Sequence, residues 1–252
     1  MSGFAPAIQE KKAERGKPPT LAVNEIFGPT IQGEGKSAGM PCHFLRLAGC
    51  NLACVFCDTP YTWKWGTGPG EFDPKKEIHP MVVDEVFDRL EEMADATGVR
   101  SLVISGGEPM LQQRALVHLT RRLHEKKWHT EIETAGTIKP HTIELVKHWT
   151  CSPKLSNSGN PLDKRYKPDA LEVIGFALSR CFKFVVTAPA DFDEIDALVK
   201  AHSLGPVYIM PEGIDSDTLD GRLGWIAEEA IKRNYWVSGR MHVQLYGNKR
   251  GV

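Results

Sequence analysis

The chain has 252 residues, of which 41% are hydrophobic and 25% are charged, and its formal net charge is −1. This length suits one large domain, and the balanced charge excludes a global field that would draw the protein to nucleic acid or an anionic membrane. No apolar run reaches the length of a membrane span, and residues 1–20 contain no apolar signal core, so we expect neither a membrane protein nor an exported one.

The N-terminal third predicts a lead-in, two strands and an insertion. Residues 1–20 are polar and punctuated by Pro and Gly, which predicts a flexible lead-in outside the domain. The apolar-rich run 21–27 predicts a strand, and 43–48 predicts a second strand that delivers the chain to a cysteine loop. Residues 62–79 are rich in Gly, Pro and Trp and predict an irregular insertion whose role the sequence leaves open.

From residue 82 onward, helical and strand patterns alternate. The pattern predicts helices over 82–93, 111–126, 140–148, 170–178, 192–202 and 223–233, and strands over 101–105, 129–133, 149–151, 182–186, 207–210 and 241–246. Strands separated by helices are typical of a parallel sheet with helical crossovers. Because roughly six such units fall short of the eight in a closed barrel, we predict an α/β fold. Its architecture is an open partial barrel of (βα)6 type within a single domain over 21–252, with the cysteine loop after the first βα region.

Three cysteines lie close together in this loop. Cys50, Cys54 and Cys57 are separated by three and two residues. A structural zinc ion normally takes four protein ligands, whereas a four-iron cluster held by three thiolates keeps one iron open for a substrate or cofactor. The spacing favours the cluster, and half of a zinc knuckle with a distant fourth ligand is the alternative. Because cluster thiolates need a reducing compartment, we expect a cytoplasmic protein.

Two turns carry further candidate groups. Gly106-Gly107-Glu108-Pro109 follows an apolar strand, and glycine there lets the backbone approach a ligand. Taken alone, this run favours a plain strand-to-helix turn with Pro109 at the first helical position. Downstream of the three-cysteine loop, it resembles the turn that holds the amino group of the cofactor in radical S-adenosylmethionine enzymes. Thr59 offers a hydroxyl that suits a Mg²⁺ ion whose other ligands are water and substrate, although Asp58-Thr59-Pro60 is also a good turn sequence.

The glycine-rich segment EIFGPTIQGEG at 25–35 suits either recognition of a polar, hydrogen-bonding ring or a plain surface loop. Together with FLRLAGC at 44–50 and CDT at 57–59, it resembles the 7-carboxy-7-deazaguanine synthase family of radical S-adenosylmethionine enzymes. ETAGT at 133–137, CSPK at 151–154 and YGNKRG at 246–251 are similar to that family too. The resemblance covers nearly everything from residue 25 onward and leaves out the lead-in.

This resemblance implies a radical ring contraction. The reduced [4Fe-4S] cluster would cleave S-adenosylmethionine, and the resulting 5′-deoxyadenosyl radical would abstract hydrogen from C6 of 6-carboxy-5,6,7,8-tetrahydropterin. The ring would then contract and lose ammonia to give 7-carboxy-7-deazaguanine, in 7-deazapurine (queuosine-type) biosynthesis. Magnesium is a further implied cofactor. The implied partners are an electron donor such as flavodoxin or ferredoxin and a second copy in a homodimer, with no nucleic acid or membrane. We assign no general acid or base, because the nine histidines are scattered singly.

The resemblance also assigns residues to each ligand. Cys50, Cys54 and Cys57 would hold the cluster, and Thr59 would hold magnesium. The expected S-adenosylmethionine contacts are Phe56, Cys57, Asp58, Gly107, Glu133, Ser152, Pro153, Lys154, Met210, Pro211, Glu212 and Gly213. The expected substrate contacts are Ile31, Gln32, Gly33, Glu34, Arg46, Ser105 and Val252. Arg46 also has a physical case of its own, because a guanidinium pairs bidentately with a carboxylate, although a surface arginine at a strand end is an equal alternative without the motif.

Two other classes of protein stay open on the sequence. One is a different radical S-adenosylmethionine enzyme, such as a glycyl-radical activase, which would act on a protein and would be expected to lack the Gln32-Gly33-Glu34 signature. The other is a non-catalytic zinc or redox module, for which the turn at 106–109 and the α/β framework would have no purpose.

Overall fold

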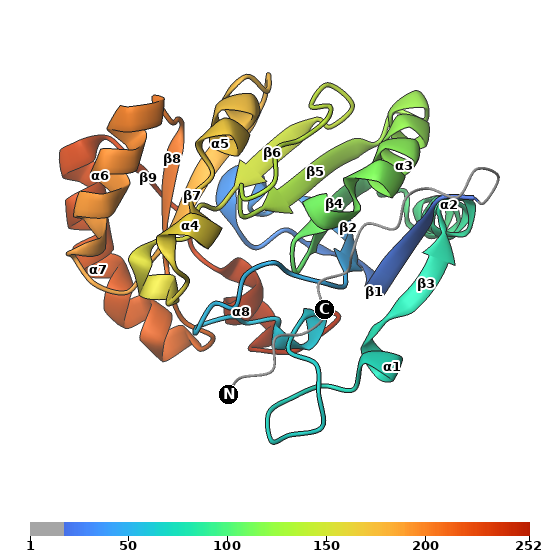
Figure 1. Cartoon of the computed structure of the whole chain (residues 1–252), viewed down its shortest axis with the longest axis horizontal. Helices are drawn as coiled ribbons and strands as arrows, with labels where there is room; N and C mark the ends of the chain where they lie inside the picture. The colour runs from blue at the N-terminus through green and yellow to red at the C-terminus, as the bar shows by residue number, and fades with distance from the viewer. Residues whose placement is uncertain (1–17) are drawn as a thin grey trace.

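A computed structural model describes residues 18–252, and its framework is one nine-stranded sheet (Figure 1). The strand order is β3-β1-β2-β4-β5-β6-β7-β8-β9. The strands are β1 Thr20–Ile31, β2 Pro41–Leu47, β3 His79–Val82, β4 Ser101–Gly106, β5 His129–Thr134, β6 His148–Cys151, β7 Arg180–Val186, β8 Val207–Pro211 and β9 Trp236–Val237. β1 pairs antiparallel with β2 and β3, and every pair from β2 to β9 is parallel.

Helices join most of the parallel strands, and the longer ones cover one face of the sheet. They are α1 Pro74–Glu77, α2 Val83–Thr97, α3 Gln113–Glu125, α4 Leu162–Arg165, α5 Pro168–Gly175, α6 Asp191–His202, α7 Ser216–Arg233 and α8 Met241–Tyr246. Single 3₁₀ turns are η1 Gly35–Ser37, η2 Pro60–Thr62, η3 Pro109–Gln112 and η4 Ser156–Ser158. The sheet order ends at β3 and β9 without a closing pair, so the predicted α/β partial barrel is confirmed.

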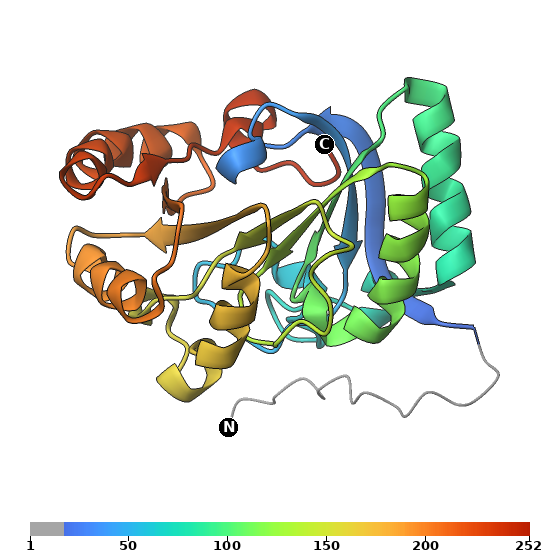
Figure 2. The same cartoon turned by 90° about the horizontal axis from the view of Figure 1, so that it is seen from above.

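The two faces of the sheet differ in chemistry because side chains alternate along each strand. Ile104, Ile132 and Phe182 point toward the helices and belong to the large core cluster. The residues that follow in the alternation, such as Ser105 and Glu133, lie on the opposite face. In Figure 2, α2, α3, α5 and α6 lie along the first face, whereas η1 and α8 lie over the second. The inner, polar face is therefore covered by the β1–β2 connection and the C-terminal segment instead of by long helices.

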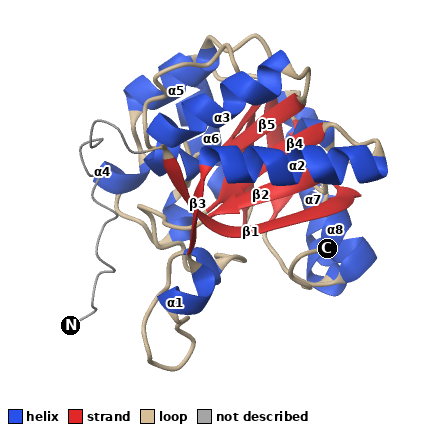
Figure 3. Ribbon diagram, turned by 90° about the vertical axis from the view of Figure 1, so that its right-hand side faces the viewer, coloured by secondary structure: helices blue, strands red, loops and turns tan. Residues whose placement is uncertain are grey.

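Helix α2 shows how local sequence builds the outer layer. Val86, Phe87 and Leu90 recur at helical spacing and are buried against the sheet. The helix ends where Gly98 adopts a left-handed φ of 74°. Figure 3 shows α2 crossing the outside of the sheet in front of β1 and β2. The predicted helix, whose apolar repeat covers 82–93 and whose expected stop is Gly98, is thus confirmed and ends at Thr97.

Two predicted elements are wrong. Residues 241–246 form helix α8 instead of a strand, with Val243 buried and Leu245 exposed. The alternation of Met241, Val243 and Leu245 is typical of a strand. The backbone hydrogen bonds are nevertheless those of a helix, since the Gly247 amide donates to the Val243 carbonyl at 2.8 Å. Residues 140–147 form turns instead of a helix. There the His141 amide donates to the Gln113 side chain at 2.8 Å, and the Trp149 indole donates to the Ile143 carbonyl at 3.1 Å.

The insertion at 62–79 is partly regular. It contains a bridge between Trp65 and Phe72 and the short helix α1, and it leads into β3. Asp73 caps α1 by accepting a hydrogen bond from the Lys75 amide at 2.9 Å. The proposed lead-in over 1–20 lies largely outside the described residues, since β1 begins at Thr20. Between residues 18 and 252, no helix has both the length and the apolar character needed to cross a bilayer.

We expect Phe182→Ala to lower the free energy of unfolding by about 3–5 kcal/mol, because it leaves a cavity in the closed core beneath the helices. Phe176→Ala is the matched control, since Phe176 is 72% exposed and its loss should change stability by less than about 0.5 kcal/mol. Urea denaturation of the cluster-free protein, followed by circular dichroism, measures both. Equal effects would contradict the inward placement of Phe182.

Candidate active site

The three clustered cysteines lie in the loop that follows β2. All three thiols are free. The Trp63 indole N–H donates to Cys57 Sγ at 3.2 Å, and Asn160 Nδ2 donates to Cys54 Sγ at 3.2 Å. Donors of this kind stabilise thiolate sulfur and tune the group that it binds. The loop therefore already has an outer layer of hydrogen bonds aimed at its sulfur atoms.

The cysteine set fits an iron-sulfur cluster better than a single ion. Burial raises the pKa of Cys50 to about 12, and burial also raises the pKa of Cys54. Thiolates here therefore need a cationic centre to balance them. In the described part of the chain, no three His, Cys, Asp or Glu side chains converge on one metal ion. A four-iron cluster spreads three thiolates over three iron atoms, whereas the zinc alternative lacks its fourth ligand among these residues.

The glycine turn after β4 lies directly against this loop. The Gly107 amide donates to the Leu47 carbonyl at 3.1 Å, and the Glu108 amide donates to the Gly49 carbonyl at 2.8 Å. A Cβ on Gly107 would lie 2.1 Å from the Gly49 carbonyl oxygen, so only glycine permits this approach. The turn and the cysteine loop are therefore one backbone-locked unit.

Glu108 of this turn has a structural role. Its side chain is fully buried and accepts hydrogen bonds from the Met110 amide at 3.0 Å, the Thr134 hydroxyl at 2.8 Å and the Ala135 amide at 2.8 Å. These bonds join the ends of β4 and β5. The carboxylate thus holds the two loops at a fixed separation.

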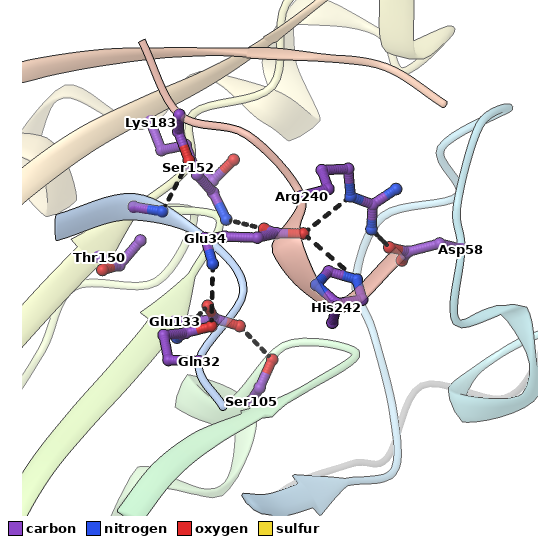
Figure 4. A network of polar contacts seen from close by, with 12 residues as sticks. Gln32, Glu34, Asp58, Ser105, Glu133, Thr150, Ser152, Lys183, Arg240 and His242 are labelled. Carbon is purple, nitrogen blue, oxygen red and sulfur yellow. Dashed lines mark hydrogen bonds and ion pairs between the residues drawn. The ribbon is translucent and has the colours of Figure 1, made fainter. Parts of the chain in front are cut away.

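Polar side chains from three segments meet on the inner face of the sheet (Figure 4). Glu133 accepts a hydrogen bond from Gln32 Nε2 at 3.1 Å and another from the Ser105 hydroxyl at 2.8 Å. Gln32 comes from the β1–β2 connection, Ser105 from β4 and Glu133 from β5. One predicted cofactor contact and two predicted substrate contacts are therefore brought together.

A second carboxyl group lies on the same face of β5. Glu131 is fully buried and accepts a hydrogen bond from the Thr150 hydroxyl at 2.7 Å. Burial, helped by the charge of Glu133, raises the pKa of Glu131 to about 7. Glu131 therefore carries a proton over part of the neutral range, which limits the negative charge inside the barrel.

An ion network closes the inner face beside these residues. Glu34 pairs with Lys183, and its other oxygen accepts from Arg240 Nε at 2.9 Å. Arg240 also pairs with Asp58. Burial alone would raise the pKa of Glu34, but the charges of Lys183 and Arg240 outweigh it and hold that pKa well below its usual value. The network joins the β1–β2 connection, the cysteine loop, β7 and the segment before α8 (Figure 4).

Arg46 is oriented by aromatic rings and a carboxylate. Its Nε donates to Glu25 Oε1 at 2.7 Å, and its guanidinium carbon lies 5.7 Å from the ring centroid of Phe27 and 5.9 Å from that of Phe44. The two rings are stacked. The Nε of Arg46 is therefore engaged by Glu25. The outer edge of the guanidinium is the part suited to a ligand carboxylate.

The remaining predicted residues fall at loop positions around the same face. Lys154 Nζ donates to the Ser152 carbonyl and to its hydroxyl, both at 2.9 Å. The Gly33 carbonyl accepts from the Met241 amide at 2.9 Å. Thr59 Oγ1 lies 3.7 Å from Cys57 Sγ. Ile31 is the last residue of β1, and Met210 and Pro211 are the last two residues of β8. Phe56 lies in the cysteine loop, Pro153 lies beside Lys154, Glu212 and Gly213 follow β8, and Val252 is at the end of the described chain.

Sequence reasoning missed Lys183, Arg240 and Asn160. A signal existed for Lys183, because a lysine between Phe182 and Phe184 in a β-branched strand must point to the opposite, inner face. Arg240 and Asn160 sit in irregular segments, where no periodicity indicates a direction. Only the folded chain shows that they reach Asp58 and Cys54.

The chain is similar to known families and proteins. A model described as the radical SAM superfamily matches residues 45–152. A 7-carboxy-7-deazaguanine synthase from Rhodopirellula baltica is 33% identical, with 94% of this chain and 91% of that protein covered. The enzyme of the same name from Pyrobaculum aerophilum is 33% identical, with 92% of this chain and 98% of that protein covered.

Solved structures show the same architecture. The crystal structure of QueE from Escherichia coli matches with a TM-score of 0.69 and 26% identity, over 88% of this chain and 95% of that one. Streptococcus suis SuiB bound to S-adenosylmethionine matches with a TM-score of 0.52 and 16% identity, over 75% of this chain and 48% of that one. The SuiB likeness supports the fold alone.

We expect Gly107→Ala to cut iron incorporation severalfold, because the new Cβ would collide with the backbone carbonyl of Gly49 in the cysteine loop. Gly175→Ala is the matched control, since a Cβ there would meet nothing within 4 Å. Iron analysis and visible absorption after anaerobic reconstitution measure the loading, and circular dichroism checks the fold. Full iron content in a folded Gly107→Ala protein would contradict the close approach.

We expect Glu34→Gln to destabilise the protein by about 3–5 kcal/mol near neutral pH, because Lys183 and Arg240 lose their buried counter-charge. The native pKa of Glu34 is below its ordinary value of 4.5, so the unfolded chain takes up the proton first as the pH falls. The stability gap between wild type and variant should stay constant above pH 4.5 and shrink below it.

Exposed Glu172 on α5 gives the control, Glu172→Gln, which should change little at any pH. Urea unfolding at a series of pH values measures all three proteins. A gap between wild type and Glu34→Gln that grows in acid would show that the sign of the pKa shift is wrong.

Proposed function

This chain belongs to the 7-carboxy-7-deazaguanine synthase family of radical S-adenosylmethionine enzymes, and we propose that it converts 6-carboxy-5,6,7,8-tetrahydropterin into 7-carboxy-7-deazaguanine with loss of ammonia. The observation that carries the proposal is a three-cysteine loop locked against a glycine turn beside a polar sheet face, in a chain matched over 94% of its length by such a synthase. A glycyl-radical activase or a zinc module is not favoured, because the two relatives that match 94% and 92% of this chain are both 7-carboxy-7-deazaguanine synthases.

When bound, the cluster and S-adenosylmethionine would supply the radical chemistry that removes a hydrogen atom from C6 of the substrate. The chain holds and orients these groups. We propose that Cys50, Cys54 and Cys57 hold the cluster. Asn160 and Trp63, which donate to two of the sulfur atoms, would keep those sulfurs in place and favour their charged form.

The S-adenosylmethionine would extend from the cluster along the carboxyl ends of the strands. Gly107 and the segment 152–154 would contact its amino acid part, because bare backbone and the ammonium of Lys154 suit charged groups. Phe56 and Asp58 would lie beside it in the cysteine loop, with residues 210–213 at the end of β8. Glu133, between Gln32 and Ser105, would mark the boundary between cofactor and substrate.

The substrate would bind on the inner face with its carboxylate at Arg46. The Nε of Arg46 is engaged by Glu25, so the outer edge of the guanidinium would take the carboxylate. Gln32, Ser105 and the backbone of 31–33 would hydrogen-bond the polar ring. Glu34 would act through the ion network that holds this loop, and Val252 would close the site from the C-terminal side.

We propose Thr59 as the protein ligand of Mg²⁺. Its hydroxyl lies 3.7 Å from Cys57 Sγ, which puts a hard oxygen beside the cluster loop, and Asp58 is occupied by Arg240. Water and the substrate carboxylate would complete the coordination. A magnesium ion there would polarise and orient that carboxylate.

We also propose the domain bounds, the compartment and the partners of this protein. The continuous sheet supports a single radical S-adenosylmethionine domain over 21–252, with residues 1–20 as a lead-in. The small net charge gives no reason to expect nucleic acid or a membrane as a partner. The free thiols support the cytoplasm as the compartment. A flavodoxin-like or ferredoxin-like electron donor and a homodimer follow from the family.

The deciding test is anaerobic turnover of the iron-loaded protein with 6-carboxytetrahydropterin, S-adenosylmethionine, magnesium and a reductant. We expect mass spectrometry to detect 7-carboxy-7-deazaguanine. Cys54→Ala should abolish both the product and the cleavage of S-adenosylmethionine, because the cluster loses a ligand. Arg46→Gln should reduce kcat/KM for the pterin by about 100-fold, because a paired carboxylate loses a charged, bidentate partner.

Two results would contradict the proposal at different levels. Cleavage of S-adenosylmethionine without any deazaguanine product would keep the superfamily chemistry and reject the substrate. A fully loaded protein that cleaves no S-adenosylmethionine would reject the enzyme itself. Arg46→Gln should still cleave S-adenosylmethionine at the wild-type rate in the absence of substrate.

A further inference from the structure

Arg250, near the end of the chain, is held by an unusually complete set of partners. Its guanidinium forms a fork on Glu77, with Nη1 donating to Oε1 at 3.2 Å and Nη2 to Oε2 at 2.8 Å. Nη2 also donates to Asn24 Oδ1 at 3.0 Å, and Nε donates to Glu25 Oε2 at 3.2 Å. The guanidinium carbon lies 4.0 Å from the ring centroid of Tyr61. Such a planar cation can satisfy all these contacts together only in one orientation.

The partners come from β1, from η2 and from the insertion at 62–79. Asn24 and Glu25 lie on β1, Tyr61 lies in η2, and Glu77 is the last residue of α1. They are also tied to one another, since Asn24 Nδ2 donates to the Glu77 carbonyl at 2.8 Å and to its carboxylate at 3.0 Å. The socket is therefore organised independently of Arg250. This arrangement gives the insertion a role that its sequence does not reveal.

One carboxylate connects this socket to the proposed substrate site. Glu25 Oε1 accepts from Arg46 Nε at 2.7 Å and from the Tyr61 hydroxyl at 3.4 Å, whereas Oε2 accepts from Arg250. The charges of this group balance, because the carboxylates of Glu25 and Glu77 form ion pairs with the guanidinium groups of Arg46 and Arg250. Seating of Arg250 thus restricts the same carboxylate that orients Arg46.

The backbone of the last residues is shaped for this contact. Gly247 and Gly251 take left-handed φ values of 65° and 72°, which bend the segment after α8 back toward β1. Figures 2 and 3 both show the C-terminal end beside β1. Arg250 itself is 40% exposed, so the segment is fastened at the rim of the site and is not buried in the core.

We propose that Arg250 is a latch, a positioning residue that fastens the segment 247–252 to the socket of Asn24, Glu25, Tyr61 and Glu77 and thereby fixes Arg46 for the substrate carboxylate. The effect on Arg46 rests on the proposed function. The fastening of the segment does not. A latch of this kind acts on substrate binding and leaves the chemistry at the cluster unchanged.

The test compares Arg250→Ala with the matched control Lys249→Ala, which removes a neighbouring exposed cation from the same segment. Chymotrypsin cleavage after Tyr246, in protein without cofactors, reports opening of the segment. We expect about tenfold faster cleavage in Arg250→Ala and less than about twofold in Lys249→Ala. In loaded enzyme, KM for the pterin should rise about tenfold in Arg250→Ala, with cleavage of S-adenosylmethionine in the absence of pterin unchanged.

Arg250→Lys is a second variant that keeps the charge and loses the fork, and it should give intermediate values in both measurements. Faster proteolysis with an unchanged KM would overturn the coupling to Arg46. Equal proteolysis of Arg250→Ala and Lys249→Ala would overturn the latch itself. The proteolysis arm needs no turnover, so failure of the proposed substrate would not be mistaken for failure of the latch.

Discussion

The ion network around Glu34 is the constraint on which the inner face depends. An open sheet whose order ends at β3 and β9 cannot enclose a ligand by strand pairing alone. Glu34, Lys183 and Arg240 solve this problem by joining the β1–β2 connection to β7 and to the segment before α8. The side chains of Lys183 and Arg240 are each only 6% exposed, so their charges are almost entirely removed from water.

Such a buried network is costly unless each charge is matched. Desolvation of isolated ions outweighs a single Coulombic pair, and the cost is offset here because Glu34 receives two cations and Arg240 receives two carboxylates. The same arrangement links Asp58, next to the cysteine Cys57, to the loop that carries Gln32. The relative placement of the cysteine loop and the β1–β2 connection is therefore fixed by ion pairs.

The sequence predicted well those features that depend on local pattern. The outer layer followed from periodicity, as in α2, and the cysteine spacing and the turn at 106–109 were enough to indicate a radical S-adenosylmethionine enzyme. Local pattern failed where tertiary contacts decide. The alternating Met241, Val243 and Leu245 predicted a strand, but β9 is only two residues long and the segment bonds within itself as α8. Lys183 and Arg240 were missed because their partners lie about 150 and 200 residues away.

The site residues divide by the kind of force that places them. At the cysteine loop, backbone carbonyls and glycines fix the geometry, since Gly107 lies against Gly49 with no room for a side chain. At Arg46, side chains fix it, through Glu25, Tyr61 and the stacked Phe27 and Phe44. Backbone contacts tolerate changes in surrounding side chains, so the cluster end suits a chemistry used on many substrates. Side-chain contacts can be changed one residue at a time, which suits the recognition of one particular carboxylate that we propose for Arg46.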